Sequence, residues 1–341
     1  MYSLTDLALP APRSIPTEGV LEEVRRRTFT RCARLGVIRD DRMTPRQFAA
    51  TKCELLSALT YPDASLDALA LCTDFFVYLF FVDDCAEEDE SFGKRPHRLQ
   101  RYFEQHIAIL RSGAPAGVAD PAGRLLVSIR ARLTERASAH WLERFANGMS
   151  DYLLRGTLEG ARHWTAGTVP SFDDFLEQRA WDSAVQCVQD LIEVAGGGEL
   201  SAAVLGRADW SALQRHCTNV VAFTNDLVSY SKEARSHENP KNLVHVIATH
   251  EKRTVTNAIG RVIEIVNQEV ASFEALAAQL PSFETAMDKN VARYLDSQRA
   301  WMVGNLTWSL AAGRYMDPQS PFVELRKPSA SLSERRYDIA G

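Results

Sequence analysis

The 341-residue sequence has no long apolar run, no excess of basic residues and no paired cysteine motif. Its longest apolar run, Phe75–Val82, is far below the roughly 20 residues that span a bilayer, so no membrane partner is expected. Lys and Arg total 39 against 44 Asp and Glu, which argues against a nucleic-acid partner. The six cysteines form no CxxC pair, so no zinc ribbon is predicted. Residues 1–16 do not resemble a secretory signal, and a cytoplasmic location with reduced thiols is expected.

Strand and hairpin signals are also nearly absent, whereas apolar residues recur at helical spacing along most of the chain. This pattern predicts an all-α fold with one large domain at residues 20–316. An N-terminal segment at 1–19 and a polar, mobile C-terminal tail at 317–341 flank it. The expected helices cover residues 20–36, 44–58, 65–84, 97–112, 122–135, 138–160, 172–195, 207–234, 239–250, 252–279 and 284–312.

A strongly acidic run follows the apolar segment Phe75–Phe81. Six of the eight residues from Asp83 to Glu90 are acidic, and Asp83 and Glu87 share a helical face. Acidic groups at a helix C-terminus oppose the helix dipole, so a bound cation would stabilise them there. A buried helix that carries paired carboxylates to its end is suited to Mg²⁺, which takes oxygen ligands. The alternative is a solvated acidic helix end.

A second polar motif lies in the predicted helix 207–234. Asn225, Ser229 and Glu233 follow one another at intervals of four residues and form a single stripe. The stripe offers an amide, a hydroxyl and a carboxylate oxygen, and Lys232 adds a cation next to it. Read without the first motif, this stripe is typical of a solvated helix face.

Taken together, the two motifs resemble the DDxx(D/E) and NDxxSxxxE motifs of class I terpene synthases. Arg179 lies 46 residues before Asn225, where the family has its diphosphate-sensing arginine, and it begins a run that resembles the family's sensor–linker–effector segment. Residues 301–315 resemble the closing motif of the bacterial family and end in Arg314-Tyr315. The resemblance covers residues 20–316.

The resemblance implies the isoprenoid synthase fold, a single α-helical bundle with a central active-site cavity. It also implies a cluster of three Mg²⁺ ions, with Mn²⁺ as a possible substitute. Asp83 would be the principal ligand from the first motif, while Asp84 and Glu87 would bind metal or pair with arginines. The remaining implied ligands are Asn225, Ser229 and Glu233.

The resemblance further implies that Arg179, Lys232, Arg314 and Tyr315 bind the substrate diphosphate. Charge-assisted donors of this kind stabilise a departing diphosphate. In the sensor–linker–effector run, Asp182 would be the linker, and Ser183 would place its backbone carbonyl near the ionising carbon at a helix break.

A dry cavity with aromatic faces would protect and stabilise the carbocation. Phe76 and Phe80 precede Asp83 on nearly the same helical face. The other aromatic candidates for the cavity wall are Trp181, Phe223, Trp301 and Trp308.

The implied function is Mg²⁺-dependent ionisation of a linear isoprenoid diphosphate and cyclisation to a terpene hydrocarbon or alcohol. Farnesyl diphosphate is favoured and geranylgeranyl diphosphate is second. A chain-elongating prenyltransferase that uses the Asp83 motif and the Asp173 motif is one alternative, although Ser171 and Asp174 are typical of a helix cap. A non-enzymatic helical binding protein is the other. Homodimers are common in the family, and no residue indicates an interface here.

Overall fold

The computed structural model describes residues 2–39, 43–87, 95–113, 118, 120–236, 241–283 and 285–326, except the side chains of Glu87, Trp164 and Ser236. The regular elements of these residues are helices, with one isolated bridge between Ile38 and Met43. The all-α prediction is confirmed. The α-helices are α1 (Glu18–Arg34), α2 (Pro45–Thr51), α3 (Cys53–Thr60), α4 (Leu66–Glu87), α6 (Pro96–Ser112), α7 (Pro121–Thr134), α8 (Ala139–Ser150), α9 (Leu158–Ala166), α10 (Phe172–Asp182), α11 (Val185–Gly196), α12 (Ala202–Leu205), α13 (Ala208–Ser236), α14 (Leu243–His250), α15 (Val255–Ala277) and α16 (Thr285–Ala311).

Three expected helices are interrupted in the structure. The helix expected at 44–58 divides at Lys52, which has a left-handed backbone with φ of 48°. The helix expected at 138–160 contains a π-helical segment, η2 (Asp151–Thr157), between α8 and α9. The helix expected at 172–195 divides between α10 and α11, where Ala184 has φ of 56°. The helix expected at 239–250 begins at Leu243, and residues 239 and 240 lie outside the described part.

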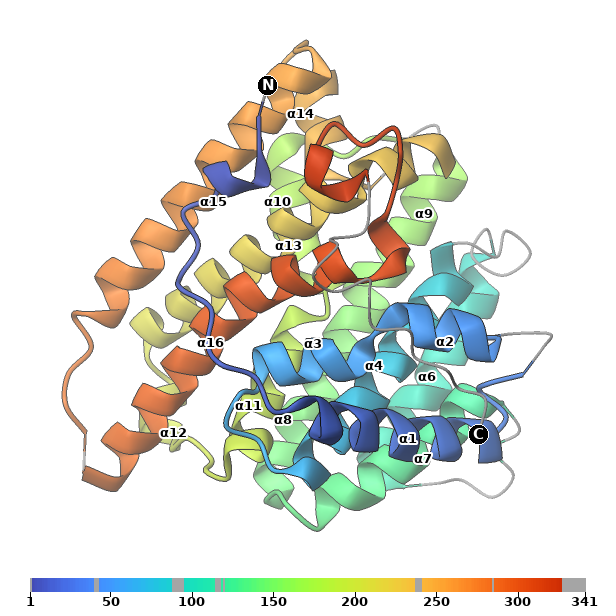
Figure 1. The fold of residues 1–341 in the computed structure, drawn as a ribbon, viewed down its shortest axis with the longest axis vertical. Coiled ribbons are helices and arrows are strands. Elements are labelled where there is room, and N and C mark those ends of the chain that lie inside the picture. The colour runs from blue at the N-terminus through green and yellow to red at the C-terminus, as the bar shows by residue number, and fades with distance from the viewer. Residues whose placement is uncertain are drawn as a thin grey trace.

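The two helices that carry the acidic and polar motifs lie inside the bundle. α4 packs against α1, α3, α7 and α11, which explains why nearly all of its faces are apolar. α13 packs against α10, α11, α14, α15 and α16. Figure 1 shows α16 crossing the bundle obliquely and α15 along its outer edge. The packing of these helices therefore fixes the positions of both motifs.

The two ends of the described chain pack together, and part of the segment expected as a polar tail takes part in this contact. Phe322 and Leu325 are fully buried, although the polar composition of 317–341 indicates a mobile tail. The Leu4 amide donates to a Glu324 carboxylate oxygen at 3.1 Å, and the Ala8 amide donates to Asn267 at 2.8 Å. In Figure 1 the red segment that ends the described part lies on the same side of the bundle as the blue N-terminal turn. Residues 327–341 lie outside the described part.

Gly156 of η2 allows a close backbone contact with the end of α10. A Cβ atom added to Gly156 would lie 2.5 Å from the Asp182 Cα atom and 2.6 Å from its backbone nitrogen. Because backbone atoms cannot swing away as a long side chain can, this position requires glycine. The contact fixes the end of α10, immediately before the interruption at Ser183 and Ala184.

We expect Gly156→Ala to lower the free energy of unfolding by about 2 kcal/mol, which is typical of forced overpacking. Chemical denaturation would measure the change. Gly19→Ala is the matched control, since nothing lies within 4 Å of the added Cβ there. If Gly156→Ala and the wild type have equal free energies of unfolding, the backbone contact between Gly156 and Asp182 does not require glycine.

Candidate active site

A cavity of about 570 Å³ lies between α4, α10, α11, α13 and α16. Its volume is in the range of small-molecule sites. One part of its wall is apolar and includes Leu56, Leu79, Val188 and Val221. The other end, here called the mouth, carries the polar residues. Those that line it include Asp83, Arg179, Asp182, Asn225, Ser229, Lys232, Glu233, Lys241, Arg314 and Tyr315.

The acidic motif of α4 meets the end of the described chain at the mouth. Arg314 lies in the short 3₁₀ helix η3 (Gly313–Tyr315) and donates to Asp83 at 3.1 Å and to Asp84 at 2.7 Å. Burial alone would lower the pKa of Arg314, but the charges of these carboxylates outweigh it and raise the pKa. Asp83 lines the cavity and Asp84 does not. The Glu87 side chain lies outside the described part.

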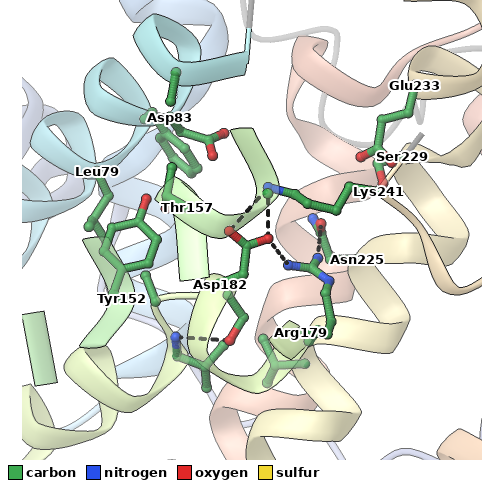
Figure 2. A pocket seen from close by; sticks show the side chains of 18 of the residues that line it. Leu79, Asp83, Tyr152, Thr157, Arg179, Asp182, Asn225, Ser229, Glu233 and Lys241 are labelled. Carbon is green, nitrogen blue, oxygen red and sulfur yellow. Dashed lines mark hydrogen bonds and ion pairs between the residues drawn. The ribbon is translucent and has the colours of Figure 1, made fainter. Parts of the chain in front are cut away.

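The polar stripe of α13 faces the acidic motif across the mouth (Figure 2). Asn225 accepts a hydrogen bond from Arg179 at 3.2 Å through its carbonyl oxygen. Its amide nitrogen donates to the Tyr315 hydroxyl at 3.0 Å. Ser229 and Glu233 follow along the same helix, and both line the cavity. The structure thus brings together the two predicted sets of oxygen atoms.

Arg179 of α10 is buried in a network of carboxylates beneath this stripe. It forms an ion pair with Asp226 at 2.8 Å and a longer one with Asp182 at 3.7 Å. Burial alone would lower the pKa of Arg179, but the nearby carboxylates raise it. Burial raises the pKa of Asp226, and the charge of Arg179 opposes that rise. Arg179 therefore stays charged beside the cavity.

The interruption between α10 and α11 lies on the cavity wall, where both Ser183 and Ala184 contact the cavity. The Ser183 hydroxyl accepts a hydrogen bond from the Val185 amide at 3.3 Å, and Ala184 has the left-handed backbone. The segment expected to act as sensor, linker and effector therefore surrounds one side of the mouth.

Four of the six expected aromatic residues line the cavity: Phe76, Phe80, Trp301 and Trp308. Phe80 stacks on Trp308 with ring centroids 5.3 Å apart, and the Arg314 guanidinium lies 5.2 Å from the Phe80 ring. One aromatic wall therefore adjoins the acidic motif directly.

The structure places the other two expected aromatic residues elsewhere. Trp181 is not part of the cavity lining and lies beneath the Arg155 guanidinium, 4.1 Å from it. Phe223 is buried in the core away from the cavity. Each lies two residues from a residue that faces the mouth, Arg179 or Asn225, and two helical residues turn the side chain through about 200°.

The second acidic string, Asp173-Asp174, is not part of the cavity. It occupies the first turn of α10, where the Asp174 amide donates to the Ser171 hydroxyl at 3.2 Å. This confirms that Ser171 caps the helix. The prenyltransferase alternative needs two acidic motifs that face one cavity. Asp83 lines the cavity, but Asp173 does not.

The comparisons with known proteins agree with this geometry. Residues 74–272 match the family model described as terpene synthase family 2, C-terminal metal binding. The chain is 30% identical to a 4-epi-cubebol synthase of Streptosporangium roseum that cyclises (2E,6E)-farnesyl diphosphate, over 91% of this chain and 92% of that protein. It is 31% identical to the pristinol synthase of Streptomyces pristinaespiralis, over 86% and 80%. The chain belongs to the terpene synthase family.

Solved structures show the same fold. The 2-methylisoborneol synthase of Streptomyces coelicolor, in complex with Mg²⁺ and 2-fluoroneryl diphosphate, superposes with a TM-score of 0.81 at 26% identity, covering 94% of this chain and 99% of that one. The germacradien-4-ol synthase of Streptomyces citricolor gives a TM-score of 0.78 at 24% identity, over 91% and 99%. The protein is a class I terpene synthase, a terpene cyclase of the carbon–oxygen lyase class. Its described residues contain no helix long and apolar enough to cross a bilayer.

The oxygen atoms at the mouth of this terpene synthase fit Mg²⁺. No three His, Cys, Asp or Glu side chains gather into a metal site among the described residues. Asp83 lies on one side, and the amide, hydroxyl and carboxylate of α13 lie on the other. Mg²⁺ is commonly bound by one or two carboxylates together with substrate phosphates. An open, divided set of this kind is therefore suited to a metal that binds together with a diphosphate.

Sequence reasoning missed Asn242, which is fully buried beside the α13 stripe. Its amide nitrogen donates to Glu233 at 2.9 Å and to the Asp226 backbone carbonyl at 2.8 Å. Its carbonyl oxygen accepts from the Val244 amide at 2.9 Å and caps α14. Asn before the apolar run Leu243-Val244 is a recognisable cap signal. Its contact with Glu233 has no signal in the sequence.

Asn242→Ser in this terpene synthase should raise the Mg²⁺ concentration for half-maximal activity by about tenfold, as loss of an outer hydrogen bond to a metal ligand commonly does. Serine still caps α14 but is too short to reach Glu233. Mg²⁺ titration of the initial rate would measure the change. Asn257→Ala, an exposed position on α15, is the control. An unchanged Mg²⁺ requirement would show that the hydrogen bond from Asn242 to Glu233 does not support metal binding.

Proposed function

We propose that this terpene synthase ionises farnesyl diphosphate and cyclises the resulting cation to a sesquiterpene hydrocarbon or alcohol. The observation that carries the proposal is one apolar cavity whose mouth holds both sets of oxygen atoms, with Arg179 and Arg314 beside them. Two relatives support the choice of substrate, since the 4-epi-cubebol synthase and a T-muurolol synthase of Roseiflexus castenholzii both cyclise (2E,6E)-farnesyl diphosphate. Geranylgeranyl diphosphate is the second candidate.

Asp83, Asn225, Ser229 and Glu233 would hold Mg²⁺, and three ions are proposed. Bound Mg²⁺ supplies Lewis-acid stabilisation of the negative charge on the departing diphosphate. Asp84 would instead anchor Arg314, because it lies outside the cavity lining and accepts from Arg314 at 2.7 Å.

The donors of the chain would bind the diphosphate from several sides. Arg179, Lys232, Arg314 and Tyr315 all line the mouth. The Tyr315 oxygen accepts a hydrogen bond from Asn225, which orients the phenol so that its own proton can be donated to a phosphate oxygen. These donors stabilise the leaving group and so make a general acid unnecessary.

The rest of the cavity would control the carbocation. Aliphatic walls exclude water, which would otherwise quench the cation. The faces of Phe76, Phe80 and Trp308 would stabilise positive charge through their π systems. The backbone at Ser183 would direct its carbonyl toward the ionising carbon, as the position of the interruption on the cavity wall allows.

The assay that tests the proposal offers geranyl, farnesyl and geranylgeranyl diphosphate separately with Mg²⁺. Gas chromatography–mass spectrometry would identify the products. A cyclic C15 product from farnesyl diphosphate is expected, and exhaustive EDTA treatment should abolish it because the proposed ligands are oxygen atoms suited to Mg²⁺. A longer prenyl diphosphate as product, or full turnover after EDTA, would contradict the proposal.

Asp83 and Asp84 should differ in their effect on turnover. Asp83→Ala removes a metal ligand, and kcat should fall about 100-fold or more. Asp84→Ala removes one partner of Arg314, and a smaller fall of about tenfold is expected. Steady-state kinetics with circular dichroism as a folding control would compare them. A larger loss for Asp84→Ala would reverse the assignment of the metal ligand.

A further inference from the structure

Lys241 reaches across the mouth to the carboxylate of Asp182. Its Nζ atom lies 2.9 Å from one Asp182 oxygen and 3.1 Å from the other (Figure 2). The side chain of Asp182 is 4% exposed and that of Lys241 is 24% exposed. A buried carboxylate needs a close cationic partner, because an uncompensated charge is costly away from water.

Gly160 of α9 provides the space for this lysine. A Cβ atom added to Gly160 would lie 2.7 Å from the Lys241 Nζ atom and 2.8 Å from its Cδ atom. The lysine side chain therefore lies flat against the backbone of α9, and its ammonium group is directed toward α10. This fit gives Lys241 a defined position.

Arg179 is the more distant of the two cations that pair with Asp182. Its Nη1 atom lies 3.7 Å from the carboxylate, and its other donors bind Asp226 and Asn225. In the proposed function Arg179 turns toward the diphosphate. If it did so without Lys241, Asp182 would be a buried carboxylate facing an anionic substrate.

We propose that Lys241 is a positioning residue for ionisation. It holds the Asp182 carboxylate while Arg179 binds the diphosphate, and so keeps Ser183 and Ala184 fixed on the cavity wall. Asp182 is therefore held at two points. Lys241 pairs with its carboxylate, and Gly156 packs against its backbone. The role in turnover rests on the proposed function, whereas the ion pair itself does not.

The main variant is Lys241→Met, which keeps a long stem over Gly160 and removes the charge. We expect kcat to fall about tenfold or more, because small displacements of catalytic groups are costly. The KM for farnesyl diphosphate should stay within about twofold, since substrate contacts remain. The share of linear and early cyclic products should rise. Lys289→Met, an exposed position on α16, is the matched control and should leave all three unchanged.

A second measurement needs no turnover. In the metal-free protein, Lys241→Met should lower Tm in the wild-type background and have little effect in the Asp182→Asn background, because coupled residues are not additive. Calorimetric titration with inorganic diphosphate and Mg²⁺ should give the same affinity for Lys241→Met and wild type.

The outcomes separate the possibilities. If Lys241→Met weakens inorganic diphosphate binding about tenfold at unchanged kcat, Lys241 is a substrate contact and the positioning role is wrong. If Lys241→Met lowers Tm equally in both backgrounds, the ion pair between Lys241 and Asp182 does not contribute to stability, and the proposal that Lys241 holds Asp182 is wrong. If wild type converts none of the prenyl diphosphates, the proposed function fails, and the Tm comparison still decides whether Lys241 holds Asp182.

Discussion

The neutralisation of carboxylates at the mouth of an apolar cavity is the constraint on which the site depends. α4, α10 and α13 each bring acidic groups to this place, where low polarity strengthens their repulsion. Arg314 compensates the pair on α4, and Arg179 compensates Asp226. These cations come from distant parts of the chain. The folded bundle therefore brings cations from several segments to one mouth, where they compensate its carboxylates.

Features that repeat within one helix could be predicted from the sequence. Asn225, Ser229 and Glu233 lie at intervals of four residues, so helix geometry alone places them on one stripe. The apolar segment before Asp83 could be recognised as a buried helix because it is apolar on nearly all of its faces. The sensor–linker–effector run and the Arg314-Tyr315 pair came instead from the resemblance to terpene synthases, and the structure places both at the same cavity.

Contacts between helices were beyond sequence reasoning. Lys241 meets Asp182 across 59 residues, and no local pattern marks either as the other's partner. Trp181 and Phe223 were assigned to the cavity because they lie near motif residues, but helical rotation carries them to other faces. The burial of Phe322 and Leu325 could not be foreseen either, because the composition around them is polar.

The contact between the two ends of the described chain bears on how the protein is made. Ser3 donates to Glu324 across 321 residues of chain. During translation, α4 and α13 leave the ribosome and can pack before the segment with Arg314 exists. Asp83 and Asp84 then lack the guanidinium that pairs with both of them in the folded chain. The ion pairs at the mouth can therefore be completed only after the segment that contains Arg314 has been synthesised.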